Sequence, residues 1–297
     1  MDLSSDDPVS LKLNWKVYWP KELKDRLGVG VALFVPGFLA FYTFLIVLPS
    51  FYVFGSWPYL ARWLLLTGLL AQFWTNWFKL LATDPNGAKV DLPSVAGENF
   101  RYCNDCKLNA PIRAFHCPTC NKCVFKRDHH ASIAGTCVGY FNHRYYLLMS
   151  LYAFVGMTYV VFLTLYYYST NLGELRPLNS WMVIMPHIAL LLRFISFWQF
   201  LITFLQGGIL AAYMGVLYFF GGQCLTIYKG QTRPEYLLSV KCFDLGIKHT
   251  LLEILGKRWH LALLCAFLKS APIGDGVSFK RNEKYDTSVT HETVKDM

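Results

Sequence analysis

The chain has 297 residues, of which 54% are hydrophobic and 17% aromatic, while only 16% carry a charge. This composition excludes an ordinary soluble domain and is typical of a polytopic membrane protein. The formal net charge of +9 would also suit a nucleic-acid partner. Lysines and arginines that flank apolar stretches, however, more often record how a protein is oriented in its membrane. We therefore expect membrane lipid as a partner and no nucleic acid.

Residues 1–26 are polar and mixed in charge, without a short apolar core followed by a small-residue cleavage site. We therefore expect an uncleaved N-terminal segment. Trp15, Tyr18 and Trp19 stand close to lysines, which favours the lipid headgroup layer, where rings and cations both find partners. A solvated tail fits the same residues equally well.

Two apolar runs follow this segment. The first, 27–54, carries no charge and is long enough to cross a hydrocarbon layer of ~30 Å. The second, 59–82, has Arg62 near one end and Lys79 near the other, where long cationic side chains can reach the interface. Residues 27–82 therefore predict a hairpin of two membrane helices.

The polar stretch 83–144 comes next and holds six of the nine cysteines. Its candidate metal ligands are Cys103, Cys106, His116, Cys117, Cys120, Cys123, His130 and Cys137. Cys-x-x-Cys pairs with interleaved histidines let thiolates and imidazoles converge on a tetrahedral ion, which is typical of structural zinc. Eight ligands suffice for two closed sites. Because the stretch has little else apolar to bury, we expect zinc to hold it folded.

Two other interpretations compete with zinc. The cysteines could form a disulfide framework or be ordinary buried thiols, but interleaved histidine has no role in a disulfide scaffold. A zinc knuckle that binds nucleic acid would need a soluble basic domain, and the apolar flanks argue against one.

A third span is expected from Tyr145 to about Thr170. The apolar stretch 181–228 that follows is too long for one crossing at 1.5 Å per residue. Polar residues gather in its first half, which favours a helix at the interface. The second half, about 200–228, is the better fourth span, so 145–228 is expected to hold the last two membrane helices and an intervening luminal or interfacial helix.

The distribution of basic residues predicts the topology. Segments 1–26, 79–144 and 229–297 contain 25 of the 28 lysines and arginines. The positive-inside rule places these segments in the cytosol, which requires an even number of crossings, and a reducing cytosol keeps the thiols free for zinc. The sequence thus predicts an α-helical polytopic membrane protein with four transmembrane helices and a cytosolic two-zinc Cys-rich domain, 83–144, between the second and third.

The cytosolic C-terminal region, 229–297, mixes charges with short apolar runs. The run 259–267 is too short to span a membrane, so we expect it to pack against the helix ends or the membrane surface. The last stretch, 280–297, is polar and is expected to be disordered.

Candidate catalytic residues follow the cysteine pairs. Asp128 precedes His129, and a carboxylate beside a histidine can orient the imidazole and stabilise its protonated form, as in sites that activate a nucleophilic thiol. A cysteine is expected beside such a pair, yet position 131 is Ala131. An alternative is that Asp128 and His129 only orient the zinc ligands.

The spacing Cys-x2-Cys-x9-His-Cys-x2-Cys-x2-Cys-x4-Asp-His-His resembles that of the DHHC protein S-acyltransferases, membrane enzymes that attach palmitate to cytosolic cysteines. The resemblance implies one zinc ion held by Cys103, Cys106, His116 and Cys123, and another held by Cys117, Cys120, His130 and Cys137. It also implies Asp128 and His129 as the polarising pair, position 131 as the acyl-accepting cysteine, and palmitoyl-CoA as the acyl donor. Cytosolic or membrane protein clients and an endoplasmic reticulum or Golgi membrane are further expectations.

The sequence departs from the family pattern at several points. Ala131 replaces the nucleophile, Asp84-Pro85-Asn86 stands for the usual Asp-Pro-Gly, and 231–235 only suggests the usual Thr-Thr-x-Glu. Alanine cannot form an acyl-enzyme thioester, so we expect turnover to be lost or strongly impaired. Three hypotheses stay open: an acyltransferase in which Ala131 is an introduced or lineage-specific change, an inactive scaffold for acyl-CoA, clients or active paralogues, and a zinc-dependent membrane adaptor without acyl chemistry.

Overall fold

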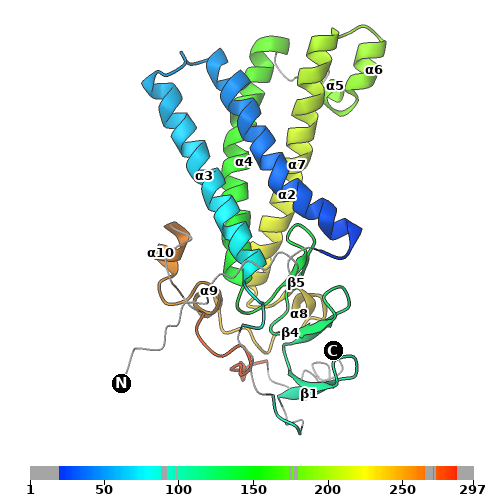
Figure 1. Cartoon of the computed structure of the whole chain (residues 1–297), viewed down its shortest axis with the longest axis vertical. Coiled ribbons are helices and arrows are strands. Elements are labelled where there is room, and N and C mark those ends of the chain that lie inside the picture. Colours follow the sequence, from blue (N-terminus) through cyan, green and yellow to red (C-terminus); the bar gives the residue numbers. More distant parts are fainter. Residues whose placement is uncertain are drawn as a thin grey trace.

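The computed structural model describes residues 20–87, 92–95, 97, 99–173, 176, 180–264, 270 and 272–285. Four long helices of this part of the chain run alongside one another (Figure 1). They are α2 (Leu23–Tyr42), α3 (Trp57–Ala82), α4 (His143–Leu172) and α7 (Phe197–Tyr228). Short strands and helices gather at one end of the bundle, below α4 in the figure. The expected headgroup contacts of Trp15, Tyr18 and Trp19 lie outside the described residues.

Three helical stretches are long and apolar enough to cross a membrane, namely Leu23–Ser50, His143–Leu172 and Phe197–Tyr228. The first includes a π-helical turn (Thr43–Val47) and a 3-10 turn (Leu48–Ser50) that continue α2. Helix α3 has 26 residues but is not among these three stretches. It lies along α4 in the bundle (Figure 1).

Helix α2 begins at Leu23, before the expected boundary at residue 27. Asp25 and Arg26 therefore belong to the helix and not to a polar tail. Asp25 is buried in the first turn of α2, where a carboxylate is favoured by the positive end of the helix dipole.

The stretch 181–228 is divided, as the sequence predicts. Two short helices, α5 (Trp181–Ile184) and α6 (Pro186–Leu191), lie beside the start of α7, at the end of the bundle far from the strands (Figure 1). Ser196 and Gln199 form a capping box, in which each side chain accepts a hydrogen bond from the backbone N–H of the other. This cap begins α7 because it satisfies N–H groups that have no partner inside the helix.

The Cys-rich segment forms three antiparallel hairpins, each of two strands. They pair β1 (Phe100–Cys103) with β2 (Leu108–Pro111), β3 (Phe115–Cys117) with β4 (Lys122–Val124), and β5 (His129–Ala131) with β6 (Thr136–Val138). In the first two hairpins the residue after the second cysteine of each Cys-x-x-Cys, Lys107 or Asn121, has a positive φ of 52° or 50°. This left-handed residue reverses the chain, so both cysteines of the pair face the same point.

Contrary to expectation, the Cys-rich segment does bury apolar side chains. Phe125 and Tyr140 are 5% and 3% exposed and pack with Val277 and Phe279 of the C-terminal region. Ile112 is buried against Val240, Cys242 and Phe243. The expectation was wrong because the apolar partners lie more than a hundred residues further along the chain.

The C-terminal region contains α8 (Arg233–Leu237), α9 (Ile247–Leu255) and α10 (Trp259–Leu264). Helix α10 lies against the bundle, since Gln72 of α3 donates a hydrogen bond to the carbonyl of Leu264. The expected disorder of 280–297 is wrong for its first residues, because Asn282 donates hydrogen bonds to the carbonyls of Cys242 and Asp244 at 2.7 and 2.6 Å. Residues 286–297 lie outside the described residues.

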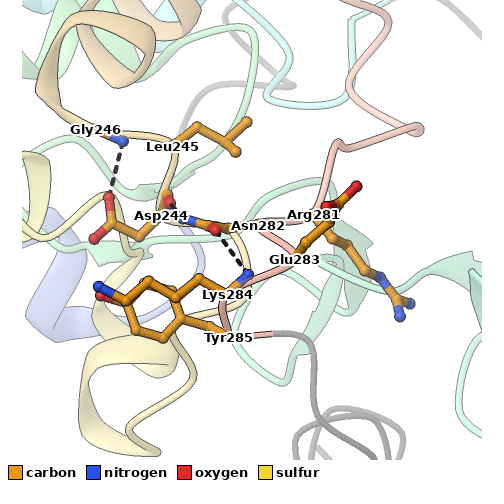
Figure 2. Close-up of a pocket in the computed structure, with 8 residues that line it drawn as sticks. All are labelled: Asp244, Leu245, Gly246, Arg281, Asn282, Glu283, Lys284 and Tyr285. Atoms are coloured by element: carbon orange, nitrogen blue, oxygen red, sulfur yellow. Dashed lines mark hydrogen bonds between the residues drawn. The ribbon is translucent and has the colours of Figure 1, made fainter.

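Residues 244–246 and 281–285 line an open pocket of about 570 Å³ (Figure 2). Asp244 accepts a hydrogen bond from the N–H of Gly246, and Asn282 accepts one from the N–H of Lys284. None of the lining residues is a candidate metal ligand or a neighbour of Asp128.

Candidate functional site

The eight candidate ligands form two separate clusters. Metal site 1 consists of Cys103, Cys106, His116 and Cys123, and metal site 2 consists of Cys117, Cys120, His130 and Cys137. Within each cluster the candidate ligand atoms all lie within 4.8 Å of one another. These are the two sets that the family resemblance implied.

The geometry of both sites fits a tetrahedral ion. In metal site 1 the His116 Nδ1 lies 3.2 and 3.9 Å from the sulfurs of Cys106 and Cys103. In metal site 2 the His130 Nδ1 lies 3.3, 3.7 and 3.8 Å from the sulfurs of Cys120, Cys137 and Cys117. Zinc bonds of about 2.3 Å to sulfur and 2.0–2.1 Å to nitrogen give ligand separations of about 3.6–3.8 Å in a tetrahedron. Either cluster can therefore hold one metal ion.

Strand pairing explains how the hairpins bring the ligands together. His116 is paired with Cys123 in β3–β4, and His130 with Cys137 in β5–β6. Directly paired residues of an antiparallel ladder place their side chains on the same face. Each histidine thus meets one cysteine across its hairpin and receives two more from a Cys-x-x-Cys turn.

Alternation along β5 separates the metal ligand from its neighbours. Successive residues of a strand point to opposite faces. His130 turns toward metal site 2, so His129 and Ala131 face the other way, toward the helices. Ala131 is 4% exposed and packs in a cluster with buried residues of α2, α3 and α4 that includes Val29, Trp77 and Met149.

Asp128 is almost fully buried and accepts three hydrogen bonds. His129 Nδ1 donates to Oδ2 at 2.8 Å, Gln223 Nε2 donates to Oδ2 at 2.9 Å, and the backbone N–H of Arg233 donates to Oδ1 at 2.9 Å. Burial opposes ionisation of the carboxyl, but the hydrogen bond from His129, the nearby His143 and the bond from Gln223 outweigh it. The pKa of Asp128 is therefore held below its ordinary value.

A second layer of contacts fixes this carboxylate. Gln223 lies on α7 and its Oε1 accepts a hydrogen bond at 2.7 Å from His143 Nε2, at the start of α4. The ring of Tyr146, also on α4, meets the ring of His129 edge-on with centroids 4.7 Å apart. Helices α4 and α7 thus hold Asp128 and His129 in place beside position 131.

Several of these residues were missed by the sequence analysis. His143, Gln223 and Trp77 stand in or next to apolar runs, where their spacing carries no signal. Trp77 donates its Nε1–H to the carbonyl of Ile133 at 2.8 Å. Asp25 was assigned to a polar tail, yet its Oδ2 lies 3.0 Å from His130 Nε2.

Two of the segments that depart from the family pattern have a structural role. Asn86, in place of glycine, donates to the carbonyl of Cys123 at 2.8 Å and accepts from the N–H of Phe125 at 2.9 Å, so it joins the end of α3 to β4. Glu235, in the altered Thr-Thr-x-Glu segment, accepts the N–H of Thr232 and binds Arg113 in a two-point ion pair at 2.6 and 2.8 Å.

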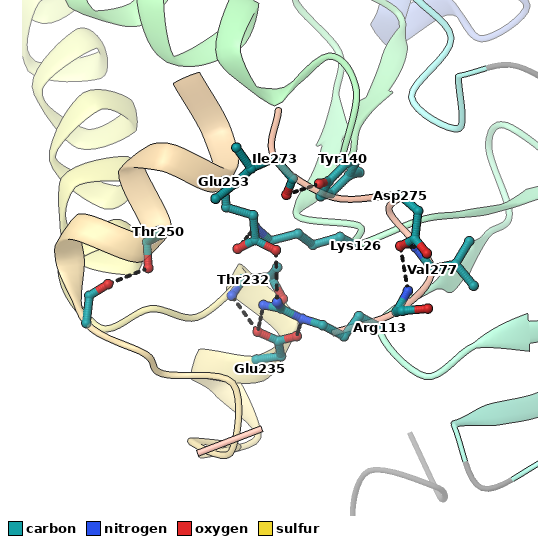
Figure 3. Close-up of polar contacts among 12 residues, drawn as sticks. Arg113, Lys126, Tyr140, Thr232, Glu235, Thr250, Glu253, Ile273, Asp275 and Val277 are labelled. Atoms are coloured by element: carbon teal, nitrogen blue, oxygen red, sulfur yellow. Dashed lines mark hydrogen bonds and ion pairs between the residues drawn. The ribbon is translucent and has the colours of Figure 1, made fainter. Parts of the chain in front are cut away.

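Arg113 and Glu235 belong to a buried group of four charges, completed by Lys126 and Glu253 (Figure 3). Lys126 Nζ lies 2.7 Å from Glu253 Oε2, and Arg113 also approaches Glu253 at 3.7 Å. Burial lowers the pKa of the Lys126 ammonium, although Glu253 opposes the shift. The two cations come from the Cys-rich segment and the two anions from the C-terminal region, so the group joins these regions.

The fold and the site define a helical membrane protein with a Cys- and His-rich segment that can hold two metal ions. A family model described as DHHC palmitoyltransferase matches residues 97–240. The human protein named probable palmitoyltransferase ZDHHC24 is 34% identical over 206 residues, which cover 67% of this chain and 71% of that protein. The mouse protein of the same name is 33% identical with the same coverage, and the Xenopus laevis palmitoyltransferase ZDHHC15 is 27% identical over 60% of this chain and 49% of its own length. The chain belongs to the DHHC palmitoyltransferase family.

Proposed function

We propose that this protein is built for protein S-acylation from palmitoyl-CoA, with two structural zinc ions, and that Ala131 removes the step in which the enzyme carries the acyl group. The supporting observation is the placement of position 131. It shares a strand face with His129, whose Nδ1 is bonded to a buried carboxylate 2.8 Å away. Zinc at the two metal sites would hold the strands and would take no part in the chemistry, because four protein ligands leave no open position.

The proposed chemistry uses the residues of the chain as follows. Asp128 holds His129 through Nδ1 and leaves Nε2 to accept a proton. A thiol at position 131 would give its proton to Nε2, attack the thioester carbonyl of acyl-CoA and release the CoA thiolate, which would take up that proton. A client thiol would then give its proton to His129 Nε2 and attack the enzyme thioester, and the thiolate released at position 131 would take up that proton. Alanine has no sulfur to form this bond.

The second candidate function is a catalytically inactive scaffold that binds acyl-CoA, clients or active paralogues. Its supporting observation is that Ala131 is itself well packed, with 4% of its surface exposed among apolar neighbours. Loss of the nucleophile therefore leaves the surrounding structure in place. As a scaffold, the protein would bind acyl-CoA and clients without transferring an acyl group.

We further propose that α3 is the second of four membrane spans and that both termini face the cytosol, in an endoplasmic reticulum or Golgi membrane. The support is that 25 of 28 basic residues fall in 1–26, 79–144 and 229–297, the segments assigned to one side. In this arrangement residues 1–26, 83–144 and 229–297 are cytosolic regions, 27–82 is the first membrane hairpin, and 145–228 holds the other two spans. Tags at the two ends should be accessible to cytosolic reagents, while a tag in 173–180 should be protected.

The experiment is incubation of the purified protein with labelled palmitoyl-CoA. The chain as written should acquire no hydroxylamine-sensitive label between Asp128 and Cys137. Ala131→Cys should acquire label at position 131, and Ala131→Cys with His129→Ala should lose most of it. A folded Ala131→Cys protein with both metal ions that never becomes labelled would contradict acyl transfer and favour the scaffold.

A further inference from the structure

Asp25 is a buried carboxylate at the start of a membrane helix. Only 2% of its surface is exposed, and its Oδ2 accepts a hydrogen bond at 3.0 Å from Nε2 of His130, a ligand of metal site 2. Among the described residues its Oδ1 has no hydrogen-bond partner. Burial of an ionised group is costly unless the group is paired. The hydrogen bond to His130 therefore explains why a carboxylate is buried at position 25.

The same side of α2 also approaches the backbone of the β5–β6 turn. A Cβ atom at Gly28 would overlap the carbonyl oxygen of Ser132 and lie 2.6 Å from its carbonyl carbon. Positions 25 and 28 are neighbours on one helix face because they are three residues apart. On the turn itself, Gly135 has a φ of 59° and a Cβ there would meet Pro20 at 2.5 Å.

We propose that the first membrane helix is a part of metal site 2. Asp25 is a positioning residue that fixes the ring of His130, so that Nε2–H points to the carboxylate and Nδ1 to the metal. Gly28, which has no Cβ, allows the β5–β6 turn to lie close against α2. This inference rests on the proposed zinc at metal site 2. Its consequence is that α2 and the strand bearing His129 and position 131 are held as one unit.

Metal site 1 provides a natural contrast. Its histidine, His116, also turns Nε2 toward a carboxylate, but Asp105 Oδ2 lies 3.9 Å away and the side chain of Asp105 is 70% exposed. Outer carboxylate partners of metal-binding histidines typically change metal affinity by 10- to 100-fold when removed. That effect is expected for the buried pair and not for the exposed one.

The first test compares Asp25→Leu with Asp105→Leu in the full-length, purified protein. Zinc is counted first and then withdrawn with a chelator, while alkylation followed by mass spectrometry reports which cysteines become reactive. In Asp25→Leu we expect Cys117, Cys120 and Cys137 to react at least tenfold faster than in the original chain, with the cysteines of metal site 1 unchanged. Asp25→Asn should restore most of the protection, because its amide oxygen can still accept the Nε2–H bond.

The second test is a pair of glycine substitutions that do not touch a metal ligand. Gly28→Ala must displace the turn, whereas a Cβ at Gly30 meets no atom within 4 Å. Both changes raise helix propensity equally. We expect Gly28→Ala to speed the alkylation of metal site 2 severalfold and Gly30→Ala to leave it unchanged.

The outcomes separate this inference from the proposed function. Fewer than two zinc ions in the original chain would overturn the zinc assignment itself. Two zinc ions with equal alkylation rates in Asp25→Leu and Asp105→Leu, or equal rates in the two glycine variants, would overturn the role of α2 alone. Uniform exposure of both metal sites in Asp25→Leu would also overturn it, because that pattern is general unfolding.

Discussion

Metal sites 1 and 2 have the same ligand set, three cysteines and one histidine, but different surroundings. Metal site 1 has three partly exposed ligands and packs with neighbouring residues of the Cys-rich segment and with Val277 and Phe279 of the C-terminal region. In metal site 2, Cys117 and Cys137 are 1% and 0% exposed, and the other face of its β5 strand packs against α2, α3 and α4. The comparison indicates that the first site supports the fold of the Cys-rich segment and that the second joins this segment to the helical bundle beside position 131.

The largest expected effect is that of removing a ligand. Binding of structural zinc is worth about 10–16 kcal/mol in small zinc domains, so Cys137→Ser should abolish folding around metal site 2. We also expect it to detach β5 from the helices and to reduce the monodisperse fraction after detergent extraction. Cys103→Ser should lose one metal ion and leave more protein monodisperse. Equal losses of monodisperse protein in Cys137→Ser and Cys103→Ser would contradict the assigned difference between the two metal sites.

The next effect concerns the buried group of four charges that joins the Cys-rich segment to the C-terminal region. Arg113→Ala leaves Glu235 buried without its ion pair, which typically costs about 3–5 kcal/mol. We expect a large fall in the thermal unfolding temperature, measured in detergent. Lys122→Ala breaks an exposed ion pair with Asp84 and should cost about 0–1 kcal/mol. A similar fall in both variants would rule out the buried group as the main anchor.

A smaller effect is expected from weakening the hydrogen bonds that hold Asp128 and His129 beside position 131. In an Ala131→Cys background, Gln223→Leu removes one of three hydrogen bonds to Asp128, a loss of about 1.5–3 kcal/mol for a bond to a charged group. Acyl labelling at position 131 should slow by roughly tenfold or more, while the zinc content stays unchanged. Cys224→Ser, one residue along α7 and exposed, serves as the matched control. Unchanged labelling in Gln223→Leu would remove Gln223 from the positioning network.

Local spacing was sufficient to predict part of this structure. The eight candidate ligands follow from Cys-x-x-Cys and His-Cys spacings that are close in sequence, while their division into two sets came from the family resemblance. The division of 181–228 follows from length alone, and the pairing of Asp128 with His129 follows from adjacency. Each of these features is fixed by a few neighbouring residues.

The remaining features depend on contacts between distant segments. Asp25 and His130 are 105 positions apart, and a charged residue before an apolar run looks like the end of a solvated tail. Gln223 and His143 are 80 positions apart and stand in or beside membrane helices. The apolar core of the Cys-rich segment was missed because Phe125 and Tyr140 find partners in the C-terminal region. Only the assembled fold supplies these partners.

The most direct test of the account is the metal content of the purified full-length protein. Elemental analysis should give about two zinc ions per chain, because eight ligands are arranged as two four-ligand clusters. Exhaustive chelation should then make all six cysteines of the two sites reactive. One zinc ion or none in folded, monodisperse protein would contradict the account.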